Sequence, residues 1–160
     1  MSNPVLSGSV SSDLSDLSVP SVLSVDEVKV GQALPPLTVH VNRASLVQYA
    51  GASLDRNPIH WDERFAKSVG LPDIIAQGMF TMGAAINVVS EWVGDAGRVV
   101  EYGTRFTRPV VVPYESGADI EVTGAVTAVD VQTRRATIAL TAICGTDKVL
   151  GRAVAVVALD

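Results

Sequence analysis

The first apolar stretch of the chain predicts a strand followed by a helix. Residues Leu37 to Val41 form a short run rich in β-branched side chains, which is typical of a strand. Asn42 directly follows this run and is a candidate N-cap, because its side chain can accept a hydrogen bond from the first turn of a helix. The helix is predicted to stop near Ser53, because Pro58 forces the residue before it into an extended conformation.

Two further helices are predicted before the pattern changes. A short one follows Asp62 as its cap and ends at Gly70. The next is the longest and runs from about Gln77 to Val93. Apolar or small residues recur along it at helical spacing, at Met79, Met82, Gly83, Ile86, Val89 and Val93. The residues between them are also largely apolar, so other parts of the chain are expected to cover this helix.

The rest of the chain alternates or clusters apolar residues as strands do. Four strands are predicted, over Arg98–Thr107, Asp119–Val129, Arg134–Cys144 and Lys148–Leu159. Gly145-Thr146-Asp147 is typical of a hairpin turn between the last two. The order of elements predicts an α+β domain in which an antiparallel sheet wraps around one long central helix. Such a sheet has open edges, so edge-to-edge dimerisation is expected.

Composition divides the chain and excludes some classes of function. Residues 1–24 are Ser-rich without a sustained period, so we expect a disordered tail, with a short docking segment as the alternative. Residues 25–160 are long enough for one domain. A formal charge of −5 argues against a nucleic-acid partner. The apolar stretch near Ile74 to Val93 is interrupted by polar residues, so no membrane span is expected. No secretory signal is recognisable, so a cytoplasmic location is expected.

One of the two histidines stands in a segment suited to acid–base chemistry. Asp55 and His60 flank Asn57-Pro58 between two predicted helices. A turn forced by Pro58 can bring the carboxyl and the imidazole to one concave side. Such a pair can move a proton and activate or release water near neutral pH. Two other interpretations stay open: Asp55 and Asn57 can build an ordinary Asx turn, and His60 can be a capping or packed histidine.

A glycine opens the long apolar helix at the motif Ala76-Gln77-Gly78-Met79. Backbone N–H groups at a helix N-terminus lack intrahelical partners and carry the positive end of the helix dipole. The Gly78 N–H could therefore stabilise an enolate-like oxygen on a thioester substrate. The alternative is that Gly78 only allows close packing of the helix against the sheet.

A longer pattern that contains these residues resembles the MaoC-like, or hydratase-2, family. The matching residues are Tyr49-Ala50-Gly51, Asp55-Arg56-Asn57-Pro58-Ile59-His60-Trp61-Asp62, Ala66, Gly70-Leu71 and Ala76-Gln77-Gly78-Met79. Glu101-Tyr102, Arg105-Phe106 and Pro109-Val110 are similar to the first long strand of the family. The resemblance covers most of the chain, so residues 25–160 are expected to be a MaoC-like hotdog domain. Within the family the chain looks most similar to the B-type subunit of the mycobacterial (3R)-hydroxyacyl-ACP dehydratase.

The resemblance implies a hydro-lyase that interconverts trans-2-enoyl and (3R)-hydroxyacyl thioesters in fatty-acid metabolism. It implies that one of His60 and Asp55 removes the α-proton while the other assists departure of the 3-hydroxyl as water, and we favour His60 as the base toward carbon 2 and Asp55 as the acid toward the hydroxyl. It also implies that Asn57 helps to hold the turn and the water, and that Gly78 supplies the oxyanion N–H. Residues expected to bind substrate are Gln77, Met79, Arg105 and Arg108. No metal or redox cofactor is implied, because coenzyme A or phosphopantetheine enters as part of the acyl-CoA or acyl-ACP substrate.

Two positions depart from the family pattern. The family usually has His where this chain has Gln77, which hydrogen-bonds but cannot carry a proton. It commonly has Gly where this chain has Leu54, and leucine takes a positive φ only at a cost. A different turn before Asp55 is therefore expected.

The partner subunit and two rival functions stay open from the sequence. The chain is expected to work as a homodimer or as a heterodimer with another hotdog subunit. A hotdog acyl thioesterase would act on similar substrates but has no need for the turn that carries Asp55 and His60. A partner-dependent subunit or a silent acyl-binding subunit is the second alternative. Gln77 adds weight to the silent one, whereas Asp55 and His60 are expected in the catalytic member of a pair.

Overall fold

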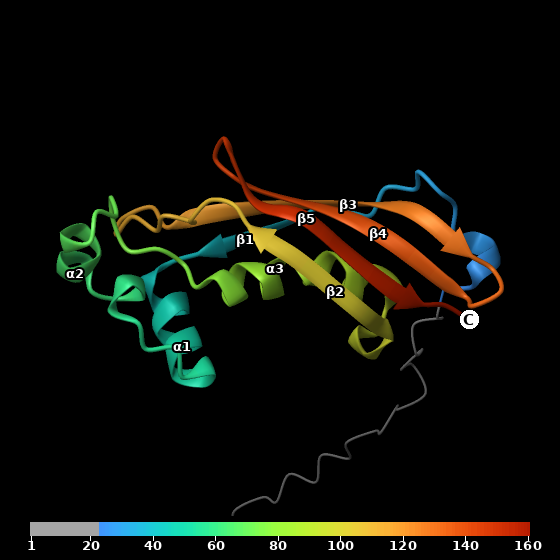
Figure 1. The fold of residues 1–160 in the computed structure, drawn as a ribbon, viewed down its shortest axis with the longest axis horizontal. Helices are drawn as coiled ribbons and strands as arrows, with labels where there is room; N and C mark the ends of the chain where they lie inside the picture. The colour runs from blue at the N-terminus through green and yellow to red at the C-terminus, as the bar shows by residue number, and fades with distance from the viewer. Residues whose placement is uncertain (1–22) are drawn as a thin grey trace, which may run out of the picture.

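The computed structural model describes residues 23–160, which form a two-layer α+β domain (Figure 1). One sheet makes the upper layer of the figure, and the longest helix lies beneath it. The predicted tail lies outside the described residues, apart from its last two. Leu23 packs against the core, and its carbonyl accepts a hydrogen bond from the Asp160 N–H at 3.1 Å. The Asp160 carbonyl in turn accepts one from the Val25 N–H at 2.8 Å.

The sheet contains five antiparallel strands in the order β1-β3-β4-β5-β2. The strands are β1 Leu37–Val41, β2 Val99–Phe106, β3 Ala118–Asp130, β4 Arg135–Cys144 and β5 Asp147–Ala158. β4 and β5 form the predicted hairpin, in which Cys144 pairs with Asp147 and Gly145 takes a φ of 60°. The predicted antiparallel sheet is therefore confirmed, with β1 and β2 as its two edges.

The helices agree closely with the predicted ones. They are α1 Arg43–Ser53, α2 Glu63–Ser68 and α3 Gly78–Val93, with short 3₁₀ turns η1 Val25–Glu27, η2 Pro58–His60 and η3 Ala96–Arg98. Asn42 and Asp62 are the predicted N-caps, and their side chains accept hydrogen bonds from the Ser45 and Phe65 N–H groups. No helix within residues 23–160 has the length and apolar character needed to cross a membrane.

The buried face of α3 differs from the predicted one. The helix buries Thr81, Ala84, Ala85, Val88, Val89 and Val93 against the sheet. Met79, by contrast, is 58% exposed, and Gly83 is also exposed. The predicted set mixed two faces, because nearly every position of α3 is apolar and periodicity alone could not choose between them. Within residues 23–160 the sheet covers one face of the helix.

The core lies between α3 and the inner face of the sheet. Its fully buried branched residues include Ile120, Val122 and Val126 on β3, Ile138 on β4, and Leu150 on β5. Burial of each such side chain stabilises the fold by roughly 1.5–3 kcal/mol. This packing holds α3 rigidly, and the candidate site is built at the N-terminal end of that helix.

The expectation that the turn before Asp55 differs because of Leu54 is wrong. Leu54 ends α1 with φ 62° and ψ 12°, the left-handed conformation that glycine favours. The side chain is 68% exposed, so no packing within the described chain compensates for this backbone conformation. The chain thus makes the turn that a glycine would make and retains the strain of a leucine there.

Candidate active site

The segment between α1 and α2 is a turn built by two successive side chains. The Asp55 carboxylate accepts a hydrogen bond from the Asn57 N–H through Oδ1 at 3.3 Å. Asn57 in turn accepts one from the Ile59 N–H through Oδ1, also at 3.3 Å, and so caps η2. Pro58 opens η2 with the fixed φ that suits a first helical position. The Asx-turn interpretation of Asp55 and Asn57 is therefore correct as a description of the backbone.

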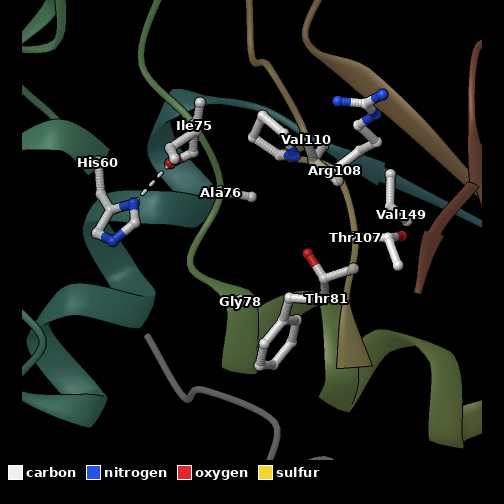
Figure 2. Close-up of a pocket in the computed structure, with 11 residues that line it drawn as sticks. His60, Ile75, Ala76, Gly78, Thr81, Thr107, Arg108, Val110 and Val149 are labelled. Atoms are coloured by element: carbon white, nitrogen blue, oxygen red, sulfur yellow. Dashed lines mark hydrogen bonds between the residues drawn. The ribbon is translucent and has the colours of Figure 1, made fainter. Parts of the chain in front are cut away.

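His60 ends η2 with its ring buried, since the residue is only 6% exposed. Its Nδ1 lies 2.7 Å from the carbonyl oxygen of Ile75 (Figure 2). A carbonyl can only accept a hydrogen bond, so Nδ1 carries the proton. In the neutral ring, Nε2 is then the nitrogen with a free lone pair. The contact therefore fixes both the ring orientation and the atom available to accept a proton.

Asp55 and His60 are brought together by the turn. The second carboxylate oxygen of Asp55, Oδ2, lies 3.6 Å from Nε2 of His60. The Asp55 side chain is 45% exposed, whereas that of His60 is 8% exposed. One carboxylate oxygen thus builds the turn while the other faces the imidazole, so the Asx turn and the acid–imidazole pair exist side by side.

A cavity of about 400 Å³ opens beside His60. Figure 2 shows His60, Ile75 and Ala76 on one side, Thr107, Val110 and Val149 on the other, and the start of α3 below. The lining is mainly apolar, with the His60 ring and a few polar groups at its border. Such an enclosure can hold a small acyl group while its reacting atoms stay near the imidazole.

The N-terminus of α3 supplies a hydrogen-bond donor to this cavity. The first intrahelical bond of α3 runs from the Thr81 N–H to the Gln77 carbonyl, at 3.1 Å, so the Gly78 N–H precedes the helical ladder. A Cβ at Gly78 would lie 3.2 Å from the ring of Phe106, which also lines the cavity. Absence of a side chain at Gly78 leaves space beside the start of α3, where Gly78 lines the cavity.

Sequence reasoning missed most of the cavity lining, including Thr81 and Phe106. Thr81 is buried on α3 one turn after Gly78, and its hydroxyl donates a long 3.4 Å hydrogen bond to the Gln77 carbonyl. The available signal was a polar residue within a run of apolar ones. Phe106 stands at the end of β2, and only the pairing of that strand with β5 brings it to the start of α3.

The four residues expected to bind substrate occupy different places. Arg108 lines the cavity. Arg105 lies on edge strand β2 opposite Gly151, and neither it nor the exposed Met79 lines the cavity. Gln77 is fully buried, and its amide donates to the Leu46 carbonyl of α1 at 3.2 Å. Gln77 therefore joins α1 to the start of α3 instead of facing the cavity.

The titratable side chains of residues 23–160 include no group of three or more His, Cys, Asp or Glu positioned to hold a metal ion. The cavity is lined by the His60 imidazole and by Gly78 at the start of α3. Asp55 does not line it, but its carboxylate lies 3.6 Å from the His60 ring. These groups can transfer protons and stabilise a developing oxyanion.

Comparison with known proteins places this geometry in context. A family model described as "MaoC like domain" matches residues 27–144. A 3-hydroxyacyl-thioester dehydratase X from Mycobacterium tuberculosis is 36% identical over 83 residues, which are 52% of this chain and 29% of that protein. A solved MaoC-like dehydratase is 44% identical with a TM-score of 0.85, covering 87% of this chain and 43% of that one. The R-hydratase PhaJ1 from Pseudomonas aeruginosa has the same hotdog fold, with a TM-score of 0.74, 24% identity and 87% coverage of both chains.

Proposed function

The chain belongs to the MaoC-like family of dehydratases and (R)-hydratases, and on that premise we propose that it interconverts trans-2-enoyl and (3R)-hydroxyacyl thioesters. The observation that carries the proposal is the contact between Asp55 Oδ2 and His60 Nε2 at 3.6 Å beside the cavity. The chain spans 29% of the mycobacterial dehydratase and 43% of the solved MaoC-like dehydratase.

In the dehydration direction, His60 removes the proton from carbon 2 through Nε2, the nitrogen left unprotonated by the bond from Nδ1 to Ile75. The electron pair of the broken C–H bond then develops on the thioester oxygen. The Gly78 N–H at the N-terminus of α3 stabilises that oxygen with a hydrogen bond and the positive end of the helix dipole.

The reaction is completed at carbon 3. The carbon–oxygen bond breaks as the carboxyl of Asp55 gives its proton to the departing hydroxyl, which leaves as water, and the double bond forms between carbons 2 and 3. The proton on His60 returns to Asp55, whose Oδ2 lies 3.6 Å from Nε2, so both residues regain their starting states. Hydration reverses these steps, and no redox change occurs in either direction.

The carrier and the assembly belong to the same proposal. Arg108, on the border of the cavity, is suited to bind a phosphate of coenzyme A or of the phosphopantetheine on an acyl carrier protein. β2 lies at an edge of the sheet and pairs only with β5 among the strands of residues 23–160, which supports assembly with a second hotdog subunit, either a copy of this chain or a different one.

The direct test is hydration of crotonyl-CoA, followed by the loss of enoyl absorbance. The full chain should consume the enoyl group without releasing free thiol and should give the (R)-product. Asp55→Asn and His60→Gln should each abolish this activity. A matched control is His40→Gln, because His40 is an exposed histidine on β1 that does not line the cavity.

The other outcomes identify the alternatives. Release of free thiol would replace the hydratase with a hotdog thioesterase. Loss of enoyl absorbance that survives in both Asp55→Asn and His60→Gln would contradict the assigned acid–base pair. Failure on crotonyl-CoA and on longer enoyl thioesters, alone and after purification with a second subunit, would leave the silent acyl-binding subunit.

A further inference from the structure

The His60 ring depends on a backbone carbonyl that is itself held by a charged network. Ile75 makes two hydrogen bonds to the segment that carries His60: its N–H donates to the Ile59 carbonyl at 3.2 Å, and its carbonyl accepts from His60 Nδ1 at 2.7 Å. The residues on either side of Ile75 form hydrogen bonds to a different segment, residues 110–112. The Ile74 carbonyl accepts from the Val112 N–H at 2.9 Å, and the Ala76 N–H donates to the Val110 carbonyl at 2.8 Å.

Asp73 fixes the start of this segment. Its Oδ1 accepts a hydrogen bond from the Ile74 N–H at 2.7 Å. The same oxygen accepts from Nη2 of Arg43, also at 2.7 Å. The side chain of Asp73 is mostly buried, so its charge is stabilised by Arg43 and not by bulk water.

Arg43 also holds the chain on the other side of the His60–Ile75 contact. Its Nη2 donates to the Glu63 carboxylate of α2 at 2.9 Å, and Glu63 lies just three residues after His60. The guanidinium carbon lies 5.0 Å from the centre of the Tyr114 ring, which limits its movement further. A single guanidinium nitrogen thus connects the segment after His60 with the segment before Ile75.

We propose that Arg43 is a positioning residue for His60, acting through Asp73. By fixing the 73–75 backbone against α2, it keeps the Ile75 carbonyl in line with His60 Nδ1. It thereby maintains the tautomer in which Nε2 is free to take a proton beside Asp55. The part that concerns catalysis rests on the proposed function, whereas the tautomer can be measured without substrate.

The test uses two variants and a matched control. Arg43→Met removes both hydrogen bonds of the guanidinium, and Asp73→Asn removes only the charge while leaving an oxygen for the Ile74 N–H. The control is Arg98→Met, because the Arg98–Asp160 pair at 2.8 Å involves an arginine with the same 22% side-chain exposure. Arg98 pairs with Asp160 at the end of the chain. The point marked C lies at the opposite end of the molecule from α1 and α2 (Figure 1).

The first readout is the tautomer of His60 in two-bond ¹H–¹⁵N correlation spectra. The chain has two histidines, and a His40→Gln variant assigns their signals. The wild type and Arg98→Met should show the proton on Nδ1. Arg43→Met and Asp73→Asn should show a share of the Nε2-protonated form, and kcat/KM should fall about tenfold, a part of the roughly 10²–10⁴-fold that a positioned base contributes.

Each contrary result has one meaning. An unchanged His60 tautomer in folded Asp73→Asn would overturn the proposal, as would an equal shift in Arg98→Met. If Arg43→Met does not fold, Asp73→Asn alone decides. A wild type that shows the tautomer pattern but no enoyl hydration would refute the proposed function and leave the positioning role in place.

Discussion

Replacement of Leu54 by glycine should stabilise the protein although it removes a large side chain. Leu54 has a φ of 62°, and an L-residue other than glycine pays about 1–2 kcal/mol to take this left-handed conformation. Glycine takes it freely but makes the unfolded chain more flexible, which costs about 0.4–1 kcal/mol. Because the leucine side chain is 68% exposed, little buried apolar area is lost. The unfolding free energy of Leu54→Gly should therefore rise by about 1 kcal/mol.

The assay compares thermal and denaturant unfolding of the wild type, Leu54→Gly and Leu54→Ala. A gain of about 1 kcal/mol corresponds to an increase in Tm of roughly 2–4 °C for a domain of this size. Alanine is the matched control, since it removes the same exposed side chain but keeps the Cβ that causes the strain. Leu54→Ala should stay near the wild type.

The reasoning is refuted if Leu54→Gly is no more stable than Leu54→Ala. If neither variant gains stability, the left-handed conformation of Leu54 does not carry the strain assigned to it. Equal gains for both variants would instead assign the effect to the exposed leucine side chain.

Two further predictions concern the cavity and the core. Gly78→Ala places a Cβ 3.2 Å from the Phe106 ring, which is half-exposed and can turn aside, so Tm should change little. Because alanine keeps the backbone N–H, the expected fall of about tenfold in kcat/KM comes from the Cβ and the displaced ring, which hinder the approach of the thioester oxygen to that N–H. A second substitution, Phe106→Leu, should restore part of the rate, and a rate unaffected by Gly78→Ala would contradict close approach of the substrate at Gly78. Burial raises the pKa of Tyr102 to about 12, above its usual value of 10, so the unfolded state loses this proton first and stability falls as pH rises from 10 to 12. Tyr102→Phe should weaken that fall in stability. It should not destabilise the protein at pH 8, because the buried hydroxyl has no hydrogen-bond partner among the described residues. Unfolding curves at pH 8 and pH 11 test both points.

The sequence identified the elements well because their signals are local. The β-branched run at Leu37–Val41, the cap at Asn42 and the turn at Gly145 depend on nearby residues, and the structure has each where it was predicted. The antiparallel sheet over one long helix followed from the order of these elements. The buried face of α3 could not be predicted, because apolar residues occur on all sides of the helix itself.

The surroundings of the site needed contacts between distant parts of the chain. The Asp55–His60 pair was predictable because Pro58 confines it to one turn. The Ile75 carbonyl that holds His60 lies fifteen residues further on, and a backbone oxygen leaves no mark in the sequence. Phe106 reaches Gly78 only because β2 pairs with β5 at the edge of the sheet, and local patterns do not specify that pairing.

The most direct test of the central claim is a double-mutant cycle on enoyl-thioester hydration with Asp55→Asn, His60→Gln and the combined variant. If the two side chains act as one proton-transfer unit, each single substitution should remove nearly all of kcat/KM, and the combined variant should be no slower than the slower single one. All three should keep the thermal stability of a folded domain. Independent losses that multiply in the combined variant, or a single variant that keeps wild-type activity, would contradict the account.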